Sequence, residues 1–346
     1  MSQSNQYWND LLAEVFGDIS DISSYSSDAT PNKVSCEEQL DELVRTVGQD
    51  GLVLVLGSGI SRNFGLPLWN QLLKDLLNAG LQKKLSEEGF RCEPSDIENL
   101  INSPLSPIII ASFIRSLAQE RFSQVVWHEL YRSPPKWNEK SEEWLSEITA
   151  LCQSKQVDSI ITYNFDDVLE QFFAKNNLDF AIYDINNTDI NLAHDVNKLP
   201  IYHVHGLLQQ HKATTENTKI IFSEEDYHEQ YHDPYSWNTL IQLDKYRSKP
   251  CLFIGTSLTD PNQRRLLELS RKRMVSNSAK HYVFRSRSSL IKSKDATSGQ
   301  NLLYPMKFME FFYERLDNDL GINTIWVEDY AEIPKLIKKI REKLEN

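Results

Sequence analysis

Short apolar runs alternate with longer amphipathic segments along most of the chain. The run at Leu52–Leu56, for example, contains β-branched residues, is bounded by Gly51 and Gly57, and is too short for an independent helix. Runs of this kind are typical of buried strands. We predict strands at 52–56, 157–162, 201–204, 219–222, 251–254, 281–285 and 324–327.

The segments between these runs carry apolar residues at helical spacing. The alternation of strands and helices favours an α/β fold with a doubly wound, mostly parallel, Rossmann-like sheet. In such sheets, ligands bind at the carboxyl ends of the strands. We predict helices at 37–47, 165–175, 223–231, 234–247, 262–274, 306–319 and 332–344.

Two regions depart from this alternation. Residues from about 84 to 153 have helical periodicity at 106–131 and 142–152 and no pattern typical of a strand, so we expect an inserted helical subdomain. Residues 1–35 include a Ser- and Asp-rich stretch and predict a flexible N-terminal arm, in which Trp8–Phe16 could form a short docking helix. The folded domain is then expected at 36–346.

Composition and charge narrow the class of protein. The chain has 346 residues, of which 40% are hydrophobic and 25% charged, as in ordinary globular proteins. Its net charge of −12 opposes binding to DNA or anionic lipid, so we expect no direct contact with nucleic acid. We also expect a cytoplasmic protein that does not engage membranes, because no run has the length of a membrane span and the N-terminus is polar.

Polar residues and glycines gather directly after four of the predicted strands. If the strands are parallel, these segments meet at one edge of the sheet, where a binding site is expected. Polar and glycine-rich residues after four strands are much less expected by chance than after one strand, so together they indicate a site. They are Gly57-Ser58-Gly59-Ile60-Ser61, Thr162-Tyr163-Asn164-Phe165-Asp166, His203-Val204-His205-Gly206 and Gly255-Thr256-Ser257-Leu258-Thr259-Asp260.

The first cluster has the composition of a phosphate-binding turn. Glycine allows backbone N–H groups to approach a pyrophosphate, so Gly57, Ser58 and Gly59 are candidates to cradle phosphates, with Ser61 adding a hydroxyl. The turn is not a full G-x-G-x-x-G motif. A tight turn before a helix explains the same residues equally well.

Taken in order, the four clusters resemble the signature of the sirtuin family. GSGIS followed by GLP is similar to the sirtuin GAGIS and GIP elements, TYNFD resembles TQNID, HVHG carries the His-Gly pair, and GTSL is similar to the sirtuin GTSL turn. The similarity spans about 51–260. It implies a domain that binds NAD.

Two departures from the deacylase pattern change the expected activity. The cysteines Cys36, Cys92, Cys152 and Cys251 form no C-x-x-C pair, so the zinc module of sirtuin deacylases is not expected, and we predict no metal. Pro67 is followed by Leu68-Trp69-Asn70 instead of the Asp-Phe-Arg segment. GLP before a Trp-bearing helix is more similar to sirtuin-like, NAD-consuming effectors of bacterial antiviral systems.

The resemblance assigns roles to two residues. Asn164 is expected to bind ribose hydroxyls or orient a water molecule, although a turn or helix-cap role is the structural alternative. His205 is the candidate general base, because imidazole titrates near neutral pH, although a histidine beside a strand is often structural. His203 is left without a role, since strand alternation points it to the opposite face.

Further residues are candidate contacts for NAD. Asp166 is expected to anchor the Asn164 loop or contact ribose, and Gly255, Thr256 and Ser257 to line the adenosine side. Thr256 and Ser257 could instead cap the following helix, and for Asp260 a cap and a site role are equal alternatives. The acidic and His-bearing stretch 224–232 is better explained as a charged helix opening than as a metal site.

The resemblance implies an NAD glycohydrolase that releases nicotinamide and ADP-ribose and depletes cellular NAD in abortive infection. A protein deacylase acting through the same site is one alternative, and a non-catalytic NAD- or ADP-ribose-binding module is another. Because such an enzyme must be restrained, we expect control by homo-oligomer formation or by a partner such as a HerA-type ATPase.

Overall fold

The computed structural model describes residues 35–48, 51–87, 89, 93–186, 197–212, 214–215, 217–272, 281–290 and 303–345. The chain divides into two units, Met1–Gln39 and Leu40–Asn346. Of the first, only the start of helix α2 (Cys36–Val47) is described, so the predicted arm and its candidate helix at 8–16 lie outside the described residues. The second unit contains the sheet.

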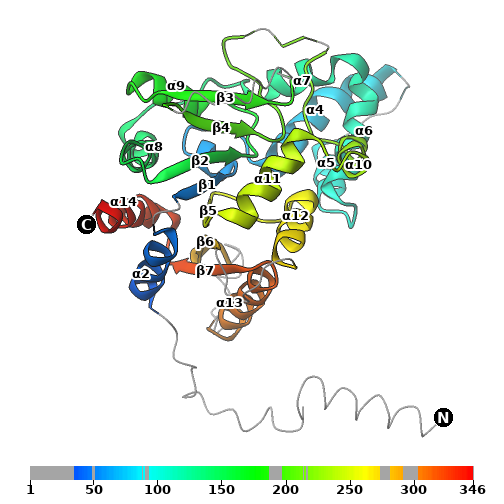
Figure 1. Cartoon of the computed structure of the whole chain (residues 1–346). Helices are drawn as coiled ribbons and strands as arrows, with labels where there is room; N and C mark the ends of the chain where they lie inside the picture. The colour runs from blue at the N-terminus through cyan, green and yellow to red at the C-terminus, as the bar shows by residue number, and fades with distance from the viewer. Residues whose placement is uncertain are drawn as a thin grey trace, which may run out of the picture. The chain divides into compact units, whose positions relative to one another are not determined.

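Within the described residues, seven strands form one sheet in the order β3-β4-β2-β1-β5-β6-β7 (Figure 1). Every neighbouring pair is parallel. The prediction of a doubly wound α/β fold is therefore confirmed. The strands are β1 (Leu52–Leu56), β2 (Val157–Thr162), β3 (Phe180–Asp184), β4 (Leu199–His203), β5 (Cys251–Ile254), β6 (His281–Ser286) and β7 (Ile322–Val327).

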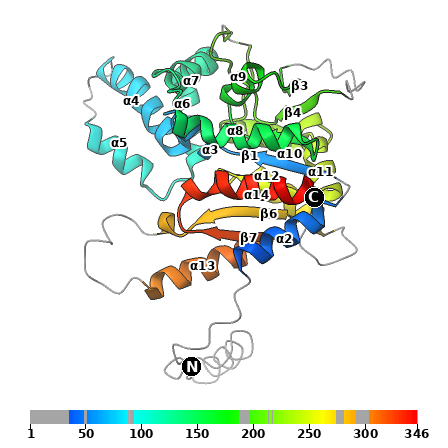
Figure 2. The same ribbon diagram turned by 90° about the vertical axis from the view of Figure 1, so that its left-hand side faces the viewer.

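Helices cover both faces of this sheet, which explains why strands β1 and β5 are apolar throughout instead of alternating. All residues of β1 and β5 are buried. Figures 1 and 2 show α8 and α14 over one face and α11 and α12 over the other. From α8 onward, the helices are α8 (Glu139–Gln153), α9 (Val168–Lys175), α10 (Glu224–His232), α11 (Trp237–Ser248), α12 (Pro261–Arg271), α13 (Leu303–Asn318) and α14 (Ile333–Glu345).

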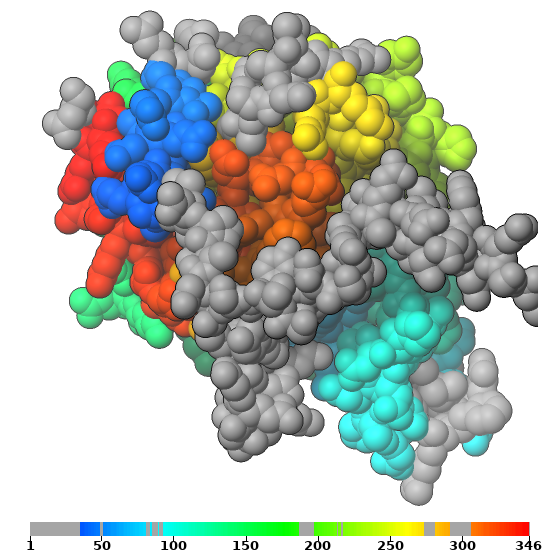
Figure 3. Space-filling model, turned by 90° about the horizontal axis from the view of Figure 1, so that it is seen from below, coloured from blue at the N-terminus to red at the C-terminus, as the bar shows by residue number. Residues whose placement is uncertain are grey.

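Helix α13 packs on edge strand β7 and forms part of the face seen from below in Figure 3, where it is orange. Its outer side exposes Phe308, Phe311 and Phe312. No described helix combines the length and the apolar character needed to cross a bilayer.

The described part of the β1–β2 connection is made of helices and turns. Apolar residues of α4, α6 and α7 share one core with Phe165, Leu208 and Phe222, which come from segments that follow β2 and β4. This packing ties the helices to the carboxyl edge of the sheet. The interpretation as an inserted subdomain stays a prediction. The helices are α3 (Gly59–Arg62), α4 (Trp69–Glu87), α5 (Pro94–Ile101), α6 (Pro107–Ala118) and α7 (Phe122–Leu130), followed by α8.

Several element boundaries differ from the prediction. The strand predicted at 219–222 is wrong: the segment is irregular, and its backbone bond toward the strands runs from Ile221 N to His205 O, beyond the end of β4, at 2.9 Å. Strand β3 was not predicted, because its residues are only half-buried and lie at the sheet edge. The helix predicted at 106–131 is interrupted at Gln119, whose φ is 51°. Helix α9 starts at Val168, because 163–167 form a loop.

Candidate functional site

The four predicted clusters lie at one edge of the sheet. They follow strands β4, β2, β1 and β5, which are consecutive neighbours in the sheet and all point the same way (Figure 1). The last paired residues of these strands are in register, with Leu56 opposite both Thr162 and Ile254, and Thr162 opposite His203. The strand order reverses at β1 and β5, which is where open α/β sheets bind ligands.

The two glycine turns at this point pack backbone against backbone. Gly57 N donates to Ile254 O at 3.0 Å, and Gly59 N donates to Gly255 O at 2.9 Å. A Cβ on Gly57 would lie 2.6 Å from Gly255 O, and one on Gly59 would lie 2.7 Å from Gly255 Cα. The glycines are thus required for contact between the turns, and the N–H groups of Gly57 and Gly59 already have acceptors.

Asn164 is held by a buried network that begins in the first turn. Its side-chain Nδ2 donates to Ser61 Oγ at 3.1 Å, and Ser61 Oγ donates to Asp166 Oδ1 at 2.9 Å. The Asn164 backbone N donates to Thr162 Oγ1 at 3.1 Å, while its side-chain Oδ1 is buried without a hydrogen-bond partner. The amide is therefore oriented by the protein and retains one unused acceptor.

Asp166 anchors this network from within the core. The pKa of its carboxyl is raised to about 6, mainly because the group is buried. The hydrogen bond from the Ser61 hydroxyl lowers this pKa, whereas the nearby charge of Glu170 raises it. Asp166 Oδ1 also accepts from Val168 N at 3.2 Å, in the first turn of α9. Of the two roles predicted for Asp166, the structure displays the anchoring of the Asn164 loop.

His203 lies behind the Asn164 loop and points into the protein. Its Nε2 lies 2.8 Å from Glu170 Oε1, and its Nδ1 lies 3.3 Å from Asn164 O. Burial alone would lower the pKa of His203, but the Glu170 carboxylate outweighs it and the pKa is raised. His203 thus supports the backbone of Asn164.

His205 sits among aromatic rings on the other side of the loop. Its ring centroid lies 4.8 Å from that of Tyr163 and 5.9 Å from that of Tyr227, both edge to face, and 6.5 Å from that of Phe165. Burial lowers its pKa, although Asp260 and Asp226 act in the opposite direction. The imidazole is therefore neutral near pH 7, as a general base must be.

Asp260 caps α12, which is one of its two predicted roles, and its carboxylate also lies beside His205. Its Oδ1 accepts from Gln263 N at 2.7 Å and caps α12, while its Oδ2 accepts from Tyr227 Oη and lies 3.5 Å from His205 Nε2. Tyr227 was not among the predicted site residues. Its one signal in the sequence is that it is one of two tyrosines in a strongly polar helix, EEDYHEQYH.

The turn after β5 is irregular and partly open to solvent. Thr256 is half-buried and its Oγ1 accepts from Leu258 N at 3.3 Å, whereas Ser257 is exposed and bonds to Thr259 Oγ1 at 2.7 Å. Leu258 has a positive φ of 57°. Neither hydroxyl caps α12, since Asp260 does, so the capping alternative for Thr256 and Ser257 is wrong.

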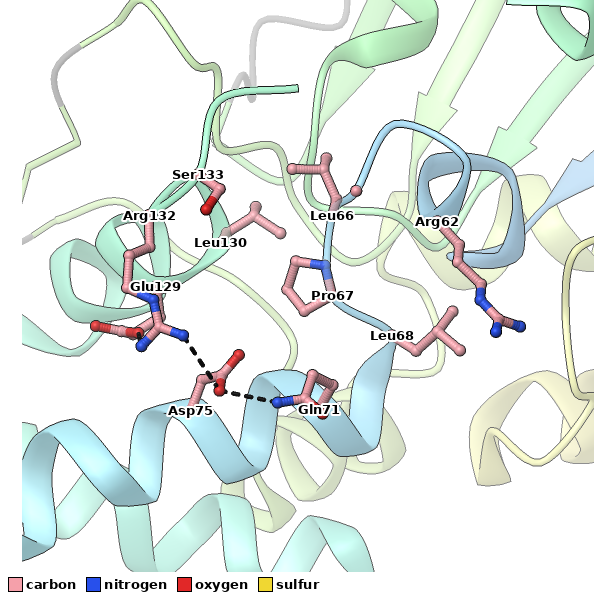
Figure 4. A pocket seen from close by; sticks show the side chains of 11 residues that line it. Arg62, Leu66, Pro67, Leu68, Gln71, Asp75, Glu129, Leu130, Arg132 and Ser133 are labelled. Carbon is pink, nitrogen blue, oxygen red and sulfur yellow. Dashed lines mark hydrogen bonds and ion pairs between the residues drawn. The ribbon is translucent and has the colours of Figure 1, made fainter. Parts of the chain in front are cut away.

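A cavity of about 360 Å³ opens next to the first turn (Figure 4). The segment from Gly65 to Leu68, which contains the GLP element, forms one wall, and the end of α7 forms another. Asp75 also lines the cavity. Its carboxylate accepts a hydrogen bond from Gln71 Nε2 at 2.9 Å and forms an ion pair with Arg132 at 3.5 Å. Arg62, which directly follows Ser61, lies at its rim.

The acidic start of α10 is a helix cap. Asp226 Oδ2 accepts from Phe222 N and Ser223 N at 2.9 and 2.8 Å, and the carboxylate pairs with Arg115 at 2.6 Å. The expectation of a charged helix opening at 224–232 is thus met. Among the described residues, no group of three or more His, Cys, Asp or Glu side chains is arranged to hold a metal ion.

Comparison with known proteins gives two matches. A family model described as "SIR2-like domain" matches residues 158–304. The NAD(+) hydrolase ThsA of Enterococcus faecium is 29% identical over 150 residues, which cover 41% of this chain and 29% of the relative. The matched part thus spans less than a third of the relative's own length. The predicted resemblance to the sirtuin family is confirmed over residues 158–304, which match a SIR2-like domain and contain the second, third and fourth clusters.

Proposed function

We propose that the chain hydrolyses NAD to nicotinamide and ADP-ribose. One observation carries the proposal: Asn164 and His205 both lie two residues beyond the paired Thr162 and His203, on neighbouring strands and beside the glycine turns. This pairing of an amide with a neutral histidine is what the chemistry requires. The similarity to an NAD(+) hydrolase supports the same reaction.

In this reaction the bond between ribose C1′ and the nicotinamide nitrogen breaks, and a bond from C1′ to a water oxygen forms. Nicotinamide leaves as a neutral molecule, and the proton lost by water goes to a base. Positive charge develops on the ribose in the transition state, so the site must hold the sugar and a water molecule in fixed positions.

The described residues suit these tasks. Asn164 would present its unused Oδ1 to water or to a ribose hydroxyl, while Ser61 and Asp166 hold the amide in place. His205 would accept the proton. Gly57, Ser58, Gly59, Gly255, Thr256 and Ser257 would form the floor for the dinucleotide, with their close packing setting its shape. No metal is assigned to the reaction.

The test is incubation of the purified chain with NAD, alone and with an acetyl-lysine peptide, followed by chromatography of the products. We expect nicotinamide and ADP-ribose without peptide, and a loss of turnover of at least 100-fold in Asn164→Ala and in His205→Ala. Ser248→Ala, at an exposed position at the end of α11 and before β5, serves as the control substitution and should leave turnover unchanged.

The alternatives predict different products. Peptide-dependent release of acetylated ADP-ribose would contradict the proposal in favour of a protein deacylase. Binding of NAD without any turnover, unaltered by partners, would favour a binding module. The site geometry is common to the hydrolase and the deacylase, so the products decide between these two enzymes, and turnover decides between an enzyme and a binding module.

We further propose that the reaction takes place in the cytoplasm and depletes NAD during abortive infection, as the family resemblance implies. Restraint would come from homo-oligomer formation or from a partner such as a HerA-type ATPase. Light scattering of the purified chain, with turnover measured across its concentration range, tests the first. Turnover with and without the co-expressed ATPase tests the second.

A further inference from the structure

His205 has a buried nitrogen whose surroundings are unusual. Its Nε2 makes no hydrogen bond, yet it lies 3.5 Å from Asp260 Oδ2. Leaving a buried polar atom unpaired costs about 1–3 kcal/mol, so native structures rarely keep one without a reason. Here the nearby carboxylate is a hydrogen-bond acceptor that Nε2 can reach by a small movement of either side chain.

The carboxylate is fixed from two different elements. Gln263 N in the first turn of α12 donates to Oδ1, and Tyr227 Oη on α10 donates to Oδ2. A carboxylate oxygen can accept a further hydrogen bond beside that of Tyr227. Capping of α12 explains the position of Oδ1 only. It explains neither the tyrosine nor the approach of Oδ2 to the imidazole.

We infer that Asp260 is a positioning residue for His205: its carboxylate holds the imidazole in the tautomer with the proton on Nε2 and leaves Nδ1 as the base. Tyr227 in turn holds the carboxylate. The inference rests on the proposed function, in which His205 accepts a proton. It extends that function by naming the basic nitrogen and the two side chains that select it.

The choice of tautomer matters because the ring is neutral. A neutral imidazole has one donor nitrogen and one acceptor nitrogen, and only the acceptor can take a proton. The groups facing the ring are Tyr163, Phe165, Tyr227, Asp226 and Asp260. The Asp226 carboxylate is held by Arg115 and by its capping bonds, whereas Asp260 Oδ2 lies 3.5 Å from Nε2, so Asp260 is the carboxylate placed to orient the ring.

The discriminating variant is Asp260→Asn. Asparagine caps helices as well as aspartate, so its side-chain oxygen can keep the bond from Gln263 N. Its NH₂ group then replaces Oδ2 and donates where the carboxylate accepted. His205 Nε2 must now accept, and the proton moves to Nδ1, which removes the base. We expect kcat to fall by about 100-fold or more with little change in KM.

Two further variants separate this role from a structural one. Asp329→Asn changes another capping aspartate, which accepts from Ala331 N at 2.8 Å beyond edge strand β7, and should leave kcat unchanged. Tyr227→Phe removes the hydroxyl but keeps the carboxylate, so kcat should fall by roughly tenfold with the tautomer retained. An equal fall in Asp260→Asn and Asp329→Asn would overturn the inference.

The tautomer can be read without turnover. In protein with ¹⁵N-labelled imidazoles, NMR shifts distinguish Nε2–H from Nδ1–H, and the His205 signals are those missing in His205→Gln. We expect Nε2–H in the parent chain and Nδ1–H in Asp260→Asn. Nδ1–H in the parent, or the same tautomer in both, would overturn the inference. A parent chain that shows the Nε2–H tautomer but never hydrolyses NAD would contradict the proposed function and not the assignment of the tautomer.

Discussion

Asp166 offers a direct test of the buried network, because its buried surroundings disfavour the ionised form of its carboxyl. Burial raises the pKa of this carboxyl from 3.8 to about 6. Such a carboxyl binds its proton more tightly in the folded protein than in the unfolded chain. Its ionisation therefore lowers stability, beginning near the unfolded pKa and reaching the full effect above about pH 6.

The size of this effect follows from the two pKa values. Their separation corresponds to about 3 kcal/mol of unfolding free energy at high pH, of which about 1.4 kcal/mol develops between about pH 5 and pH 8. Asp166→Asn removes the titration but keeps an oxygen that can accept from Ser61 Oγ and Val168 N. The variant should therefore gain stability relative to the parent as pH rises.

The assay is urea denaturation of both proteins across this pH range, with the free energy of unfolding extrapolated to water. His203 also contributes, because its raised pKa gives stability at low pH that is lost as pH rises. Glu170 is the main cause of the raised pKa and is present in both proteins, whereas the smaller effect of the Asp166 charge is lost in the variant, so most of this contribution cancels in their difference. A difference that stays constant from pH 5 to pH 8 would refute the reasoning.

Two other substitutions test neighbouring parts of the site. Ser61→Ala should cost about 1–3 kcal/mol of stability and lower NAD turnover, because Asn164 Nδ2 loses its acceptor and Asp166 Oδ1 keeps only the bond from Val168 N. Urea denaturation and product chromatography measure the two effects. Gly255→Ala should lower the free energy of unfolding by about 1–3 kcal/mol or more, since φ is 68° and the added Cβ would lie 2.8 Å from Ile60 N. The exposed control Ser257→Ala should change it by no more than about 0.5 kcal/mol in the same urea denaturation.

The sequence predicted those features that depend on local pattern. Strands β1, β2 and β5 were placed at their observed bounds. Strands β1 and β5 were predictable because fully buried parallel strands are short apolar runs that stand out from their surroundings. Edge strand β3 was missed because half-buried residues produce no such run. The predicted strand at 219–222 has the apolar residues of a strand, but they pack against the helical core instead.

The candidate site was predictable where residues act close to their own strand, as Asn164 and His205 do. Its supporting contacts were not, because they join residues far apart in the chain. Ser61 was expected to face phosphates, yet its hydroxyl lies between Asn164 and Asp166, more than a hundred positions away. The contact of Tyr227 with Asp260 depends on how α10 packs beside α12, which no local pattern encodes.

The arrangement of these contacts bears on how such an enzyme could be restrained. Asn164 is already oriented through Ser61 and Asp166, and Asp260 already faces His205, so neither candidate catalytic residue needs a rearrangement of the fold to reach its place. A restraint that disassembled the site would have to break several buried hydrogen bonds, each costing about 1–3 kcal/mol. Control of access to the sheet edge costs far less. Under the proposed function, a partner or an oligomer contact should therefore alter KM for NAD more than kcat, and the converse result would place the switch inside the buried networks.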